Sequence, residues 1–157
     1  MILLTFLLAC TGDTTTDSTA DEDPAEHACE QVGVPGTAVT ATAEPEGAPA
    51  VEPSEDPLTV TLVDDGTGVF SGYISLHADV ALDALLFTDT PDIVATLWDG
   101  ETEVGLAEPG PNEFCPDELP EHWPLALAEG TYTLELGPSA TDTLWLMYLS
   151  AAGHVAH

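Results

Sequence analysis

Apolar and polar residues alternate along most of the chain after about residue 30, as in residues 58–62 (LTVTL) and 130–136 (GTYTLEL). Successive side chains of a β-strand point to opposite faces of its sheet, so this two-residue period predicts strands with one buried face. Gly, Pro, Asp or Asn interrupts the pattern about every 8–12 residues, which is typical of an all-β domain. No run has a convincing helical period, and the chain is predicted to be all-β.

We expect about eight or nine strands, which fit a single antiparallel β-sandwich better than two domains. The final candidate, residues 144–149 (LWLMYL), is apolar on both faces and is expected to be covered on both sides. The strand candidates are residues 39–43, 58–62, 70–76, 81–87, 93–98, 101–106, 124–127, 130–137 and 144–149.

Three segments carry more specific signals. Residues 79–87 contain good helix formers, although we favour a strand there. The pair Asp99-Gly100 predicts a hairpin with a type I′ turn, in which both central residues have positive φ. Residues 44–57 contain four prolines, which exclude a central strand or helix and predict an exposed loop.

The charge of the chain excludes several classes of partner. Its 157 residues include 29 Asp or Glu and no Lys or Arg, for a formal charge of −29. Binding to nucleic acid and attraction to anionic membranes both depend on Lys and Arg. We therefore expect no nucleic-acid partner, and the lack of a P-loop Lys or Arg clamp argues against most phosphoryl-transfer chemistry.

Residues 1–10 (MILLTFLLAC) form an apolar run that is too short to span a bilayer and fits the core of an export signal. Its end, Leu7-Leu8-Ala9-Cys10, resembles the bacterial lipobox, which implies cleavage before Cys10 and lipid addition to that residue. No Lys or Arg precedes the run, which departs from the usual signal. The alternative is an apolar first strand that ends in Cys.

The domain organisation follows from the signal and from the acidic segment after it. Residues 11–26 (TGDTTTDSTADEDPAE) have too little apolar surface to fold and suit a disordered tether. We therefore expect a signal peptide at 1–9, a lipidated Cys10 with tether at 10–26, and a β-sandwich domain at 27–157. A multiply acylated Cys10 would anchor the chain stably to a membrane of the bacterial cell envelope, facing the periplasm or the exterior.

The other two cysteines, Cys29 and Cys115, are an even number in a chain that carries an export signal, and they predict a disulfide. The alternative is a redox or metal-binding thiolate pair. That alternative lacks a CxxC spacing or a Lys or Arg neighbour to lower the thiol pKa.

Residues 70–150 resemble the bacterial pre-peptidase C-terminal type of β-sandwich. The segments that carry the resemblance are DALLFTD, DIVATLWDG and LALAEGTYTLELGPSATDTLWLMY, in which Gly130-Thr131-Tyr132 is the best-matching motif. The resemblance implies a jelly-roll-like fold and a non-catalytic accessory role outside the cytoplasm. It brings no catalytic residues.

Histidines and carboxylates are the candidate metal ligands. A Cys29–Cys115 bridge would bring His27 near the loop that leads to His122, so Zn²⁺ or Cu²⁺ would find two imidazoles and a carboxylate there, from Glu26, Glu30, Glu118 or Glu121. His154 and His157 would contribute or bind metal on their own. The alternative is that all four are solvated loop and tail side chains.

Other chemistry has weaker signals. Ca²⁺ would find oxygen ligands at Asp64-Asp65-Gly66, at residues 89–92 and at Asp99-Gly100, but none matches an EF-hand loop. No GxSxG elbow is present, and His77 as a base for Ser71 or Ser75 is the one remaining catalytic pairing. We therefore expect no enzyme.

The sequence thus predicts an exported, lipid-anchored, non-enzymatic β-sandwich that binds a divalent cation through His and carboxylates. The alternative is a surface module that recognises a protein or glycan. That module would use the loops 44–57 and 107–120 and aromatic residues that do not enter the core, drawn from Trp98, Trp123, Trp145, Tyr73 and Tyr132.

Overall fold

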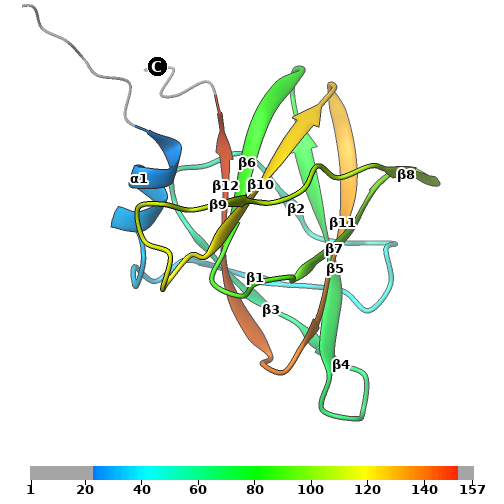
Figure 1. The fold of residues 1–157 in the computed structure, drawn as a ribbon. Coiled ribbons are helices and arrows are strands. Elements are labelled where there is room, and N and C mark those ends of the chain that lie inside the picture. The colour runs from blue at the N-terminus through cyan, green and yellow to red at the C-terminus, as the bar shows by residue number, and fades with distance from the viewer. Residues whose placement is uncertain (1–22, 152–157) are drawn as a thin grey trace, which may run out of the picture.

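Two six-stranded sheets packed face to face form the domain in the computed structural model, which describes residues 23–151 (Figure 1). Sheet A has the strand order β1-β3-β12-β6-β10-β9, and sheet B has the order β2-β5-β11-β7-β8 with β4 paired to β5. The elements are α1 (Pro24–Glu30), β1 (Thr37–Thr40), β2 (Ala50–Val51), β3 (Leu58–Thr61), β4 (Val63–Asp64), β5 (Phe70–Ala78), β6 (Leu82–Thr88), β7 (Val94–Asp99), β8 (Thr102–Val104), β9 (Gly110–Pro111), β10 (Glu121–Leu127), β11 (Gly130–Ser139) and β12 (Thr143–Ser150).

The predicted sandwich is confirmed, but its sheets are mixed rather than purely antiparallel. β1 pairs with β3 in parallel, and β2 pairs with β5 in parallel, while the remaining pairings are antiparallel. After β1 the chain crosses to the edge of sheet B, where it forms β2, and then returns to sheet A as β3. This long connection brings β3 back in the same direction as β1, whereas a tight hairpin would have reversed it.

All nine strand candidates form strands, and three strands were not predicted. β2, β4 and β9 contain two residues each, too few to show a period. β2 lies in the proline-rich segment 44–57 at the edge of sheet B, where only one side needs a partner, so the exclusion of a central strand there holds. The segment 79–87 contributes β6 and no helix.

The core lies between the two sheets and follows the predicted alternation. In β5, Ile74 and Leu76 are fully buried, whereas Tyr73 and His77 on the opposite face are partly exposed. In β11, Leu134 and Leu136 are buried in the same way. Each such side chain contributes about 1.5–3 kcal/mol by leaving water, so the alternation supplies the main stabilisation of the sandwich.

A second apolar cluster covers the outer face of sheet A. It consists of Ala25, Ala28, Phe87, Leu119, Met147 and Leu149. Because β12 contributes Met147 and Leu149 here and Leu146 and Tyr148 to the inner core, its two apolar faces are both covered, as predicted.

Helix α1 is a correction to the all-β prediction and to the boundary of the tether. Asp23 caps the helix by accepting a hydrogen bond from the Ala25 backbone N–H at 2.9 Å, and Pro24 occupies the first turn. Ala25 and Ala28 are buried against β12 and β6, and this packing orders residues 24–26, which the sequence analysis placed in the tether. No helix in the described range is both long and apolar enough to cross a membrane.

The hairpin at Asp99-Gly100 is present, but its turn differs from the predicted one. Asp99 is the last residue of β7 and pairs with Thr102, so the two turn residues are Gly100 and Glu101. Gly100 has φ of +58° and Glu101 does not have a positive φ, which is the pattern of a type II′ turn. The Gly at the first turn position explains why the two-residue loop forms.

Candidate functional site

A disulfide between Cys29 and Cys115 fastens α1 to the loop that leads into β10, as predicted. The two Cα atoms are 5.8 Å apart, and the bridge closes a separation of 86 residues. The buried Asn112 lies beside it, with Nδ2 at 3.4 Å from the Cys29 sulfur. Structural disulfides persist in oxidising compartments, so the bridge points to an extracytoplasmic location.

The predicted metal ligands are divided between the described residues and the rest of the chain. His27 lies on α1 and His122 on β10. Cys10, His154 and His157 lie outside the described residues. Across residues 23–151, no group of three or more His, Cys, Asp or Glu side chains is placed to hold a metal ion.

The imidazole of His122 is part of the packing on the outer face of sheet A. Its ring centroid is 5.6 Å from that of Phe87, the residue directly opposite on β6. Gly110 is the residue opposite on β9, and its missing side chain leaves room for the ring. Nδ1 is buried without a hydrogen-bond partner among the described residues. This placement makes His122 a packing residue more than an exposed ligand.

The carboxylates proposed for Ca²⁺ at residues 64–66 instead stabilise their own loop. Asp64 accepts hydrogen bonds from the backbone N–H groups of Gly66 and Gly68, and Asp65 accepts from Thr67. The hydroxyl and then the backbone N–H of Thr67 lower the pKa of the Asp65 carboxyl. These are Asx-type turn contacts, which explain the acidic residues without a cation.

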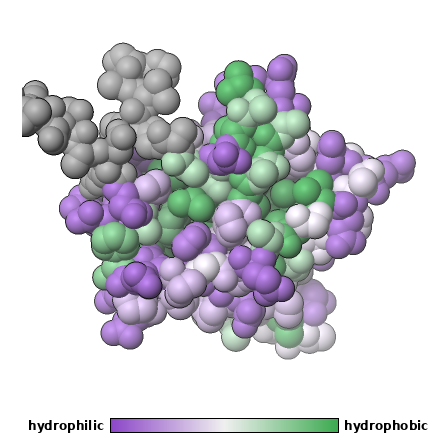
Figure 2. Space-filling view, turned by 45° about the horizontal axis from the view of Figure 1, so that its top comes forward, coloured by the Kyte–Doolittle hydropathy of each residue, from purple (hydrophilic) through white to green (hydrophobic). Residues whose placement is uncertain are grey.

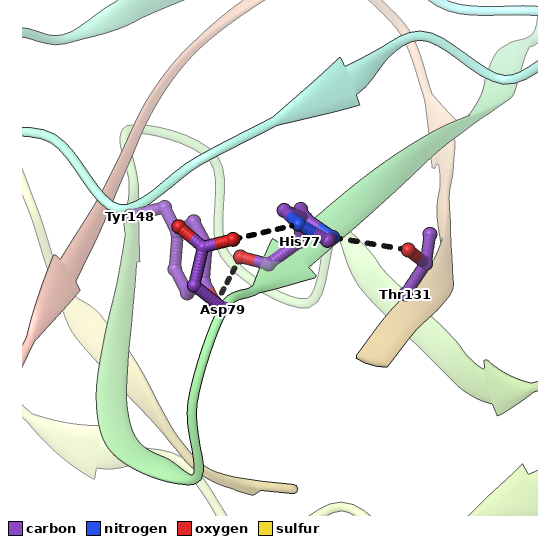
Figure 3. Close-up of polar contacts among 4 residues, drawn as sticks. All are labelled: His77, Asp79, Thr131 and Tyr148. Atoms are coloured by element: carbon purple, nitrogen blue, oxygen red, sulfur yellow. Dashed lines mark hydrogen bonds and ion pairs between the residues drawn. The ribbon is translucent and has the colours of Figure 1, made fainter. Parts of the chain in front are cut away.

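His77, near the end of β5, lies in a small polar cluster on the outer face of sheet B (Figure 3). Its Nδ1 is 3.1 Å from the Thr131 hydroxyl and its Nε2 is 3.1 Å from an Asp79 carboxylate oxygen. The hydroxyl partner is thus Thr131 on the neighbouring strand and neither Ser71 nor Ser75. Asp79 has an 83% exposed side chain, so this is a solvated surface pair.

The outer face of sheet B carries an open cavity with two aromatic side chains, which we call the aromatic cavity. Its volume is about 250 Å³, and its lining residues are Pro45, Tyr73, Trp98, Gly100, Glu101 and Thr133. Trp98 on β7 lies directly opposite Thr133 on β11, and Tyr73 extends from β5 on the far side of β11. Three adjacent strands and the β7–β8 turn thus converge on one hollow.

Carboxylates surround the aromatic cavity. Glu101 lines it, and Glu135 and Glu44 lie beside Tyr73. Burial raises the pKa of the Tyr73 phenol, and the charge of Glu135, a hydrogen bond to Glu135 and the charge of Glu44 raise it further. The cavity therefore combines aromatic surface with a negative potential.

Of the five aromatic residues singled out in the sequence, Trp98 and Tyr73 line this cavity, whereas the other three pack in the cores. Tyr132 belongs to the inner core, Trp123 packs against it, and Trp145 packs against the outer cluster. Strand parity places Tyr73 and Trp98 on the outer face of sheet B, because their neighbours Ile74 and Leu97 face inward. Trp145 also faces outward, but it packs in the apolar cluster that covers sheet A.

A second cavity of about 320 Å³ lies beside β10, between residues 105–107 and 124–127. Its lining is mostly apolar and includes Leu106, Leu125 and Leu127. Figure 2 shows apolar residues gathered near the upper ends of β6 and β10 as drawn in Figure 1.

No family model matches this chain, and no curated protein matches its sequence.

Proposed function

We propose that this chain is an exported, lipid-anchored, non-enzymatic module that recognises a ligand through the outer face of sheet B. The observation that carries the proposal is a difference in how far the outer faces of the two sheets are covered. The helix and the disulfide-linked loop cover sheet A, while sheet B has an open hollow lined by Trp98 and Tyr73. Ligand sites are typically concave, with aromatic surface and a few polar groups.

Several features support the extracytoplasmic and lipid-anchored part of this proposal. The Cys29–Cys115 disulfide suits an oxidising compartment. Leu7-Leu8-Ala9-Cys10 resembles a lipobox, and the acidic residues that follow suit a tether. We also propose that the domain is related to the pre-peptidase C-terminal type of domain and has an accessory role. The two-sheet architecture supports this relationship.

The anchor is tested by expressing the full chain in a bacterial host supplied with an alkyne-tagged fatty acid. We expect label on the wild-type chain and none on Cys10→Ala, with Cys29→Ala and Cys115→Ala as cysteine controls that keep it. A mature wild-type chain that retains an unmodified Met1 would contradict the anchor.

The recognition surface is tested with arrays of purified bacterial polysaccharides and short peptides. The full chain carries Cys10→Ser to keep it soluble, and binding is compared between Trp98→Leu and the control Phe114→Leu. Phe114 is a 51% exposed aromatic residue on the loop near the disulfide. We expect the first substitution to abolish binding and the second to leave it unchanged; equal binding by both variants would sink the proposal.

The divalent-cation function stays a prediction from the sequence. Its predicted ligands are His27 and His122 with a carboxylate. His154 and His157, which lie outside the described residues, would contribute or bind metal on their own. Metal analysis of the full chain tests it directly. Zn²⁺ or Cu²⁺ that copurifies with the wild type and is lost on His154→Ala/His157→Ala would favour it over solvated histidines.

A further inference from the structure

The size of the aromatic cavity limits what it can hold. Drug-sized ligands occupy pockets of roughly 300–1,000 Å³, whereas this cavity has about 250 Å³ and opens to solvent. It therefore suits a ligand smaller than a drug-sized molecule. Larger ligands would fit only by presenting one small group to it.

The charge around the cavity selects the sign of that group. Glu101 is in the lining and Glu44 and Glu135 flank Tyr73, while the chain has no Lys or Arg to balance them. An anionic group would be repelled by these carboxylates and would find no Lys or Arg with which to pair. A cation would be attracted by all three, and its attraction would be weakened by salt.

The chemistry of the walls selects the kind of cation. Indole and phenol rings attract cations through their quadrupole, and they favour cations that carry apolar groups, such as quaternary ammonium. Small metal ions require several oxygen or nitrogen ligands, and the described part of the chain gathers no such set. Thr133 and Pro45 add one hydroxyl and further apolar surface.

We propose that the aromatic cavity binds a small quaternary ammonium cation of the choline type. Trp98 and Tyr73 contact the methyl groups, and Glu101 neutralises the charge from the rim. This inference rests on the proposed recognition function, because it names the ligand of the same face. A neutral sugar would gain ring contact and hydroxyl–carboxylate hydrogen bonds there, but it would leave the negative charge of the carboxylates unbalanced.

The test is an NMR titration of the full chain, again with Cys10→Ser, at constant ionic strength. Choline is the probe, and 3,3-dimethylbutan-1-ol is its neutral counterpart of the same shape. We expect choline to shift the Trp98 indole N–H saturably and to bind about tenfold more tightly than the alcohol. Equal affinity for the two compounds would overturn the proposal.

Substitutions separate the contribution of the Trp98 ring from that of the Glu101 charge and from general electrostatic screening. Trp98→Leu should abolish the saturable shifts of neighbouring amides, whereas Trp98→Phe should retain part of the affinity because it keeps a ring. Glu101→Gln should weaken binding severalfold, and the control Glu108→Gln, an exposed carboxylate on the segment between β8 and β9, should not. Near-UV circular dichroism establishes that each variant is folded.

Two outcomes contradict the inference without touching the broader function. If Trp98→Leu leaves the choline-induced shifts unchanged, the cation only screens the acidic surface. If array ligands bind in a Trp98-dependent way and choline does not compete with them, the face recognises something other than an ammonium group. The array result alone decides the proposed function, so the two failures are distinguishable.

Discussion

The ring of His122 occupies the space that a side chain on Gly110 would need. A Cβ atom built on Gly110 lies 2.8 Å from Cε1 and 2.9 Å from Nε2 of the imidazole. The two residues are paired between β9 and β10, and Phe87 packs on the ring from β6. The short β9 strand therefore approaches β10 closely only because residue 110 is a glycine.

Replacing Gly110 by Ala should destabilise the fold by about 1–3 kcal/mol, because the methyl group must displace the ring or the strand. Gly105→Ala is the matched control, since a Cβ there meets nothing within 4 Å. Urea unfolding of both variants measures the difference. Equal stability of the two would show that the imidazole moves aside freely.

The disulfide should contribute about 4 kcal/mol to the free energy of unfolding, since it closes a long loop in the unfolded chain. We expect the double variant Cys29→Ala/Cys115→Ala to lose that amount in urea, with Cys10→Ser as the control that loses none. Hydrogen exchange should quicken first in α1, whose buried residues are Ala25 and Ala28. Unchanged exchange in α1 would show that its apolar packing holds the helix without the bridge.

The sequence predicts which face of a strand is buried better than it predicts which strands pair with each other. Alternation identified the inner face of β5 and β11, because each strand is long enough for the period to be visible. It says nothing about which strands pair, so the parallel β1–β3 contact was missed. The seven residues of α1 bury only two alanines, a pattern too short to separate from an acidic tether.

The candidate site shows the same limit. The even number of cysteines predicted the bridge, which links α1, the helix of His27, to the loop before β10, the strand of His122. Whether an imidazole faces solvent or packs on Phe87 depends on cross-strand register, which no local pattern records. Trp98 and Tyr73 were recognised as aromatic candidates, but their convergence on one cavity requires the order of β5, β11 and β7.

Salt should stabilise the fold, because the formal charge of −29 is opposed by no Lys or Arg. Raising NaCl shortens the screening length from about 10 Å at 0.1 M to about 3 Å at 1 M and weakens this repulsion. We expect the free energy of unfolding to rise over this range. Neutralising the exposed Asp99, Glu101 and Glu103 to Asn and Gln should reduce the slope; an unchanged slope would place the repulsion elsewhere.

Alkaline pH should destabilise the fold through Tyr148. Its side chain is 1% exposed in the inner core, and its hydroxyl donates a long hydrogen bond of 3.5 Å to the His77 carbonyl (Figure 3). Burial, with a smaller effect of Tyr132, raises the pKa of Tyr148 to about 12. An unfolded tyrosine ionises near pH 10, so above that pH the unfolded chain holds fewer protons than the folded one, and stability falls.

The loss should begin near pH 10, be complete above about pH 12 and reach about 3 kcal/mol, at about 1.4 kcal/mol for each unit of pKa. Tyr148→Phe removes the ionisable group and only one long hydrogen bond, so it should show a flatter profile over the same range. Urea unfolding at pH 8, 10 and 11.5 measures both chains. If the variant loses as much stability as the wild type between these values, a group other than Tyr148 controls the alkaline transition.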